Sequence, residues 1–113
     1  MPVKRNPLNL NALQLKTLTL LQELARVPGY SGPGESSGHV IVRPPAAHGD
    51  HFHLGDTVVH SRDATGLRNP AVWVTLQRKG LIRSMYPDCA ELTAAGLDYE
   101  TGLREAIVHR SGH

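Results

Sequence analysis

The 113-residue chain has few of the residues on which several protein classes depend. Its single cysteine, Cys89, excludes an internal disulfide framework and fits a reducing, cytoplasmic location. No apolar run approaches the roughly 20 residues of a membrane-spanning helix, so we expect no membrane partner. Aromatic residues make up 4% of the chain, which leaves the core to aliphatic side chains. The sequence therefore predicts one small domain with an aliphatic core.

Signatures of catalysis are also lacking. His60, Ser61 and Asp63 lie close together in sequence, but on a helix they would face different directions and form no catalytic triad. No glycine-rich loop is followed by the Lys-Ser/Thr pair that binds phosphates in a P-loop. We therefore expect that the protein is not an enzyme.

The distribution of prolines, caps and leucines divides the chain into three parts. Residues 1–10 are predicted as a flexible basic arm, 11–108 as the folded domain and 109–113 as a tail. Within the domain, Asn11 and Gln14 have the spacing of a capping box at the start of a helix.

That first helix carries an unusually wide apolar face and ends near Arg26. A face of this width indicates either a central core helix or a helix that also seals a homodimer. The interface residues in the second case would be Leu13, Leu20 and Leu24.

Short β-branched and alternating segments follow. Residues 39–43 are predicted as a strand, and 51–54 as its partner in a hairpin that spans residues 44–50. Asp56 is a suitable N-cap for a helix that would run to about Ala64.

The second half of the chain carries clearer signals. Asn69 is the N-cap of a helix that has proline at its first position and ends at Gly80. A hairpin over 81–92 follows, and then a last helix from Thr93 to about 108. This order predicts an α+β fold, mainly α: a winged helix-turn-helix with an extra β-hairpin between the first and second helices.

The stretch from Thr65 to Val72, continued by 78–82, resembles the helix-turn-helix of MarR-type winged-helix regulators. In that family a Gly-Leu-x-x-Pro-Ala-Val turn leads into a recognition helix that ends in Lys-Gly-Leu-Ile. Residues 91–96, Glu-Leu-Thr-Ala-Ala-Gly, are similar to the family's Leu-Thr-x-x-Gly at the end of the wing. The resemblance covers roughly residues 56–100. It implies a DNA-binding transcriptional regulator that acts as a homodimer.

The formal net charge is +2, but the charged residues are distributed unevenly along the chain. Residues 66–86 contain four basic side chains and no acid, whereas 88–105 contain five acids and one base. A basic helix and wing favour double-stranded DNA as a partner. The side chains expected to contact DNA are Arg68, Asn69, Gln77, Arg78, Lys79 and Arg83, with Lys4 and Arg5 on the arm.

Trp73 supports a hypothesis of a different class. Winged-helix domains also serve as protein-interaction modules, because a fold does not fix a function. In an adaptor without DNA binding, Trp73 and the 39–54 hairpin would form the docking surface. A core position for the Trp73 ring is the competing interpretation.

A histidine-rich segment supports a further alternative. On a strand, His51 and His53 would point to the same face, with His48 and Asp50 nearby in the preceding turn. Imidazole and carboxylate ligands of this kind suit Zn²⁺ or Ni²⁺, which would make the protein a metal-responsive regulator. Without a metal, the same residues are polar positions on a hairpin, and no cofactor is expected.

Overall fold

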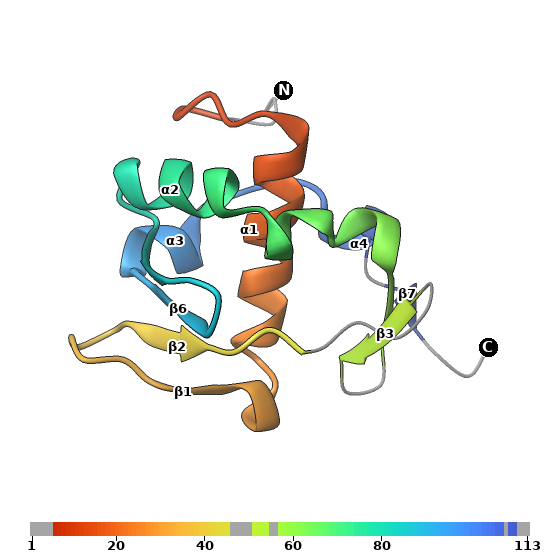
Figure 1. Cartoon of the computed structure of the whole chain (residues 1–113), viewed down its shortest axis with the longest axis horizontal. Coiled ribbons are helices and arrows are strands. Elements are labelled where there is room, and N and C mark those ends of the chain that lie inside the picture. The colour runs from red at the N-terminus through yellow and green to blue at the C-terminus, as the bar shows by residue number, and fades with distance from the viewer. Residues whose placement is uncertain (1–5, 46–50, 55–56, 108, 111–113) are drawn as a thin grey trace.

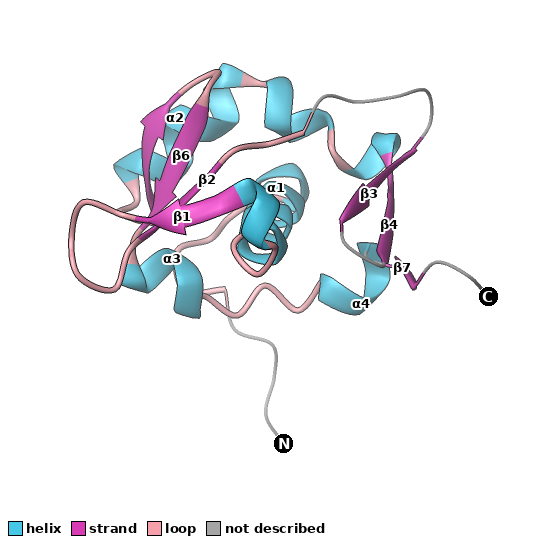
Figure 2. Cartoon of the chain, turned by 90° about the horizontal axis from the view of Figure 1, so that it is seen from below, coloured by secondary structure: helices cyan, strands magenta, loops and turns pink. Residues whose placement is uncertain are grey.

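The computed structural model of the chain describes residues 6–45, 51–54, 57–107 and 109–110, with side chains in 6–45 and 58–107. Four α-helices and seven strands lie in these ranges. The strands form two antiparallel sheets, one on each side of the long helix α1 (Ala12–Leu24), as Figures 1 and 2 show. The expectation of a small α+β fold is therefore confirmed.

The larger sheet joins two hairpins. Its strands, in order across the sheet, are β1 (Ser31–Pro33), β2 (Val40–Val42), β6 (Cys89–Leu92) and β5 (Ile82–Met85). The smaller sheet consists of β3 (His51–Leu54), β4 (Thr57–His60) and β7 (His109–Arg110). The contact between β2 and β6 brings a strand that follows α1 beside the hairpin that the sequence predicts over 81–92.

Helix α1 begins with the capping box that the sequence predicts. The side chain of Asn11 accepts a hydrogen bond from the backbone N–H of Gln14 at 2.8 Å, and the Gln14 side chain accepts one from the Asn11 N–H at 2.9 Å. From Thr17 to Leu21 every residue is buried, so the helix is enclosed on all sides there. Of the two interpretations of its wide face, the central core helix is correct.

Because of this burial, two of the three leucines that were expected at a dimer interface are not accessible to a second chain. Leu20 and Leu24 are completely buried within a single chain, and only Leu13 keeps some exposed surface. A homodimer sealed by Leu20 and Leu24 is therefore not compatible with the structure, because both side chains already pack in the chain's own core.

The described part of the predicted flexible arm is packed against the domain. The Asn6 side chain accepts a hydrogen bond from the N–H of Leu10 at 3.0 Å and donates one to its carbonyl at 2.8 Å. The Leu10 side chain is buried in the core, and the Leu8 N–H donates to the Tyr99 hydroxyl at 3.1 Å. The prediction of flexibility is wrong for residues 6–10. Residues 1–5 lie outside the described range.

Two predictions between α1 and the next helix are also wrong. Strand β3 does not pair with β2: it pairs with β4, and β2 lies between β1 and β6. The helix expected from Asp56 to Ala64 is instead strand β4 followed by a 3₁₀ turn over Ser61–Asp63. The β-branched run Thr57-Val58-Val59 explains the strand, because such residues favour extended backbone and Val59 is completely buried.

Helix α2 (Pro70–Arg78) has the boundaries that its caps predict. The Asn69 side chain accepts a hydrogen bond from the Ala71 N–H at 3.0 Å. Gly80 follows the helix at φ +80°, a conformation that glycine adopts without strain. The predicted hairpin over 81–92 is confirmed as β5 and β6, which pair from Ile82 opposite Leu92 to Met85 opposite Cys89.

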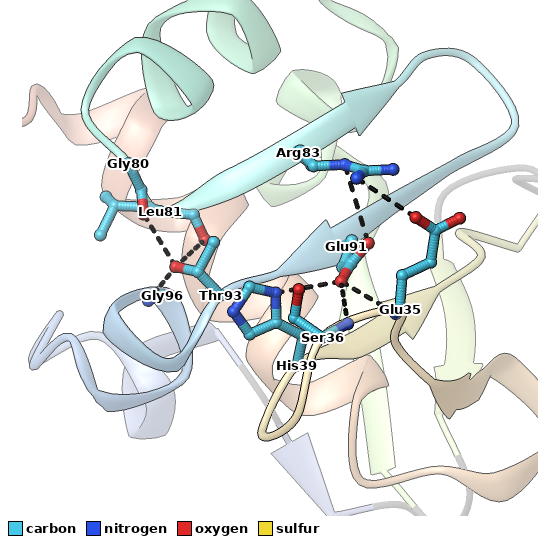
Figure 3. A network of polar contacts seen from close by, with 9 residues as sticks. All are labelled: Glu35, Ser36, His39, Gly80, Leu81, Arg83, Glu91, Thr93 and Gly96. Carbon is cyan, nitrogen blue, oxygen red and sulfur yellow. Dashed lines mark hydrogen bonds and ion pairs between the residues drawn. The ribbon is translucent and has the colours of Figure 1, made fainter.

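The last predicted helix is divided in two. Thr93 caps α3 (Ala94–Asp98) as expected: its hydroxyl accepts from the Gly96 N–H at 3.0 Å, and donates to the Gly80 carbonyl at 2.8 Å (Figure 3). The chain then leaves the helix, and α4 (Arg104–Ile107) begins only after Gly102, whose φ is +74°. His109 and Arg110 pair with β4, so these two residues of the predicted tail belong to the smaller sheet.

In the part of the chain that the structure describes, none of the helices combines the length and the apolar character that crossing a bilayer requires.

Gly66 allows the 3₁₀ turn Thr65–Arg68, which precedes α2, to lie close to α1. A Cβ atom at this position would lie 1.8 Å from Oγ1 of Thr17 on α1. We expect Gly66→Ala to lower the free energy of unfolding by about 1–3 kcal/mol, because either α1 or the turn must move. Urea unfolding measures the change. Gly29→Ala is the matched control, since its Cβ would meet no atom within 4 Å. Equal stability of the two variants would contradict the expected contact.

Candidate nucleic-acid interface

The outward face of α2 is the first part of the site. Val72, Trp73 and Leu76 are buried beneath the helix. Its exposed residues share one side and include an apolar side chain, an amide and a guanidinium: Pro70, Ala71, Val74, Gln77 and Arg78. None of the nine residues of α2 is acidic. The face can therefore approach a polyanion without a repelling carboxylate on the helix itself.

Arg68 and Arg78 are the two cations available at this face. Both side chains are exposed, and within the described ranges neither guanidinium makes a hydrogen bond or an ion pair. The backbone carbonyl of Arg68 accepts a hydrogen bond from the Tyr86 hydroxyl at 2.9 Å, which joins the start of α2 to the hairpin β5–β6. These are the positions expected for phosphate contacts at each end of a recognition helix.

Gln77 connects α2 to the same hairpin. Its Oε1 accepts a hydrogen bond from the backbone N–H of Ser84 on edge strand β5 at 2.7 Å. Since a backbone N–H can be met only by the oxygen of the amide, this contact fixes the orientation of the group. The NH₂ of Gln77 is left as a donor on an exposed side chain. Asn69, by contrast, uses its side-chain oxygen as the cap of α2.

Lys79 and Arg83 have partners within the chain. The Lys79 ammonium donates to the backbone carbonyl of Leu8 at 2.6 Å. Arg83 lies between two carboxylates, with Nη1 at 3.3 Å from Glu35 and Nε at 3.8 Å from Glu91. Their charges are thus partly used in holding the domain together. Lys4 and Arg5 of the arm lie outside the described residues.

A polar network that the sequence did not predict joins the β5–β6 hairpin to the β1–β2 loop and is drawn in Figure 3. The Glu91 side chain on β6 is only 1% exposed. Its Oε2 accepts hydrogen bonds from Nδ1 of His39 at 3.0 Å and from the backbone N–H groups of Glu35 and Ser36 at 3.1 and 3.4 Å. Its Oε1 has no hydrogen-bond partner among the described residues, and faces Nε of Arg83 at ion-pair distance. Glu91 thus joins the β1–β2 loop to the β5–β6 hairpin.

Burial and hydrogen bonding act in opposite directions on this carboxyl. Burial alone would raise the pKa of Glu91, because it disfavours the charged form. The hydrogen bonds from His39, Ser36 and Glu35, together with the charge of Arg83, outweigh burial and hold its pKa below the ordinary value of 4.5. Glu91 is therefore ionised at neutral pH, and it anchors the loop as a carboxylate.

Gly34 allows the loop to close over the carboxylate. A Cβ at this position would lie 2.8 Å from Oε2 of Glu91 and 2.7 Å from Cβ of His39. No signal in the sequence marks this arrangement, because Glu91 alternates with Ala90 and Leu92 like an outward-facing strand residue. In the structure the loop covers that face, and all four residues of β6 are buried.

Trp73 lies in the core. Its ring is completely buried, and Nε1 donates to the carbonyl of Gly66 at 3.1 Å. Tyr86 packs edge-on against it, with ring centroids 5.1 Å apart and an interplanar angle of 81°. The use of Trp73 as an exposed docking anchor is therefore wrong. The buried face of α2 is wider than expected, because the 3₁₀ turn and the β5–β6 hairpin both close over this side chain.

The predicted metal site falls mostly beyond the described residues. His48 and Asp50 lie outside them, and for His51 and His53 the structure describes only the backbone of β3. Within the described residues, no group of three His, Cys, Asp or Glu side chains is arranged to hold a metal ion. The metal-responsive alternative stays a prediction.

A concave surface elsewhere on the domain differs in charge from α2. A cavity of about 710 Å³ lies beside the C-terminal end of α1, at the segment that joins α3 to α4. Four carboxylates and two guanidinium groups line it: those of Glu23, Asp98, Glu100, Glu105, Arg26 and Arg104. Glu23 and Arg104 also form an ion pair at 2.7 Å. This excess of negative charge does not suit a nucleic acid, and α2 with its hairpin remains the candidate interface.

Glu91→Gln tests the polar network by its dependence on pH. Because the folded state lowers the pKa of Glu91, its charged form contributes stability above the ordinary value of 4.5, and this contribution is lost as pH falls through the lowered pKa. We expect E91Q to be less stable than wild type at neutral pH and the difference to shrink in acid. Urea unfolding over a pH series measures it, with Glu100→Gln, at an exposed position, as the control. A difference that is absent at neutral pH, or constant with pH, would contradict this role.

Comparison of the chain with protein-family models, with curated proteins and with solved structures found no match. The resemblance to MarR-type regulators therefore stays a prediction from local sequence. What α2 and its hairpin do has to be inferred from their geometry and charge. The first observation is that the guanidinium groups of Arg68 and Arg78 have no partner among the described residues, next to a helix that carries no acid.

Proposed function

We propose that this protein is a winged helix-turn-helix regulator that binds duplex DNA, with α2 in the major groove and the β5–β6 hairpin as a wing against the phosphate backbone. The order of elements supports this: α1, strands β1 to β4, two 3₁₀ turns, α2 and the hairpin, with β2 beside β6 and β5 in the larger sheet. The turns Ser61–Asp63 and Thr65–Arg68 stand where such domains have their second helix.

The observation that carries the proposal is the chemistry of the exposed side of α2. Arg68 and Arg78 offer unpaired guanidinium groups that suit phosphate oxygens, and Gln77 offers an amide donor for a base edge. A protein that neutralises phosphates in this way gains affinity through release of counterions. The proposed contacts therefore predict binding that weakens as salt increases.

Rigid attachment of α2 to the wing supports the same function. Two contacts join them directly: the Ser84 N–H donates to Gln77, and the Trp73 ring packs against the Tyr86 ring. The Tyr86 hydroxyl also donates to the carbonyl of Arg68, in the turn that precedes α2. Fixed relative positions reduce the entropy that is lost on binding, because the two elements need not be ordered by the DNA.

The proposal does not depend on a homodimer. A two-fold dimer would present two copies of α2 to one duplex, but its contact would have to use surfaces other than Leu20 and Leu24, which are buried. The homodimer stays a prediction. The adaptor hypothesis is not favoured, since Trp73 is not exposed to a partner.

Single substitutions of the two arginines test the proposal. We expect Arg68→Ala and Arg78→Ala each to weaken binding to a duplex of about two helical turns by roughly tenfold, the value of one charged hydrogen-bonded contact. Each should also reduce the magnitude of the slope of log affinity against log salt by about 0.9. Fluorescence anisotropy over a series of salt concentrations measures both quantities.

The matched control is Arg26→Ala. Arg26 is an exposed arginine that follows the C-terminal end of α1, and Figure 1 shows this end of the helix away from α2. Its removal changes the net charge of the protein equally but should leave the salt slope at the wild-type value. The proposal fails if Arg68→Ala and Arg78→Ala change affinity and slope no more than Arg26→Ala does.

A further inference from the structure

Val74 stands at the centre of the exposed face of α2. At about 3.6 residues per turn, its side chain lies midway between that of Gln77 on one side and that of Ala71 on the other. It is 56% exposed, and is the only exposed large hydrophobic residue among the side chains that the structure describes. A helix that entered a groove along this face would therefore present an apolar side chain first.

The residues around Val74 are polar donors. Gln77 lies three positions further on, within the spacing at which side chains on one face of a helix are neighbours. Because the Ser84 N–H occupies its oxygen, Gln77 can offer its NH₂ to an acceptor but cannot easily make the paired donor–acceptor contact by which glutamine recognises adenine. Arg78 adds donors only. The face thus combines an apolar centre with donors, and its amide oxygen already accepts a hydrogen bond from Ser84.

Thymine is the base whose major-groove edge complements this combination. It carries a C5-methyl group beside the O4 acceptor, whereas cytosine presents a donor and no methyl group. We propose, as a deepening of the proposed function on which it rests, that α2 selects thymine: Val74 packs on the C5-methyl group, and the NH₂ of Gln77 donates to O4 of the same or the adjacent base.

Removal of the methyl group from the DNA tests the contact directly. The probes are two alternating duplexes of about two helical turns, one of adenine with thymine and one of adenine with uracil, which differ only in the C5-methyl groups. We expect wild type to bind the thymine duplex about fourfold more tightly, since burial of one methyl-sized group has roughly this effect. In Val74→Ala the ratio of the two affinities should fall to near one.

Thr75→Ala is the control variant, because Thr75 is the next residue on α2 but lies at the edge of the exposed face. It should keep the wild-type ratio. Thermal unfolding establishes that both variants fold, and Val74 is exposed enough that its truncation should leave the core unchanged. An effect of uracil on the shape of the duplex would enter the ratio of every variant equally, so it cancels when the wild-type ratio is compared with that of Val74→Ala.

The outcomes separate the two proposals. A wild-type ratio near one, with binding that still weakens as salt increases, would overturn the selection of thymine and leave DNA binding in place. A ratio that Val74→Ala leaves unchanged would overturn the role of Val74. No salt-dependent binding to either duplex would overturn DNA binding and the selection of thymine together.

Discussion

The enclosure of α1 on all sides is the constraint on which the rest of the structure depends. A surface helix needs to bury only one face, but residues 17–21 of α1 are buried without interruption. Complete burial of a leucine contributes about 1.5–3 kcal/mol, and four leucines of this helix are completely buried: Leu18, Leu20, Leu21 and Leu24. Each neighbouring element is therefore held against a different side of the same helix, which fixes where α2 and the two sheets can lie.

Polar contacts then fix the candidate interface on this core. The carboxylate of Glu91 holds the β1–β2 loop, and Arg83 joins it to Glu35. The contacts of Tyr86 and Gln77 connect the hairpin to α2. Arg83 and Lys79 make contacts within the domain, so their charges are less available to a ligand. The basic segment 66–86 consequently offers fewer unpaired cations than its composition indicates.

The parts of the fold that depend on local chemistry could be predicted from the sequence. Asn11, Asn69 and Thr93 cap the helices expected of them, because a cap is decided by side chains within three residues. The pairing of β2 with β6, and of β3 with β4, could not be predicted in this way, since local side chains do not decide which strands pair. Asp56 as a possible N-cap also indicated a helix, whereas the β-branched residues that follow it form β4.

The candidate site shows the same limit. Its exposed arginines follow from the position of α2, but the burial of Trp73 and the loop over Glu91 depend on contacts from other elements, which no spacing in the sequence reveals.

The central claim is that α2 and the wing together contact duplex DNA. The most direct measurement is a map of backbone amide NMR shifts as a duplex is added. If α2 and the wing bind DNA as proposed, the largest changes occur in 68–85. Changes confined to the cavity beside α3 and α4, or no saturable changes, would rule out this interface.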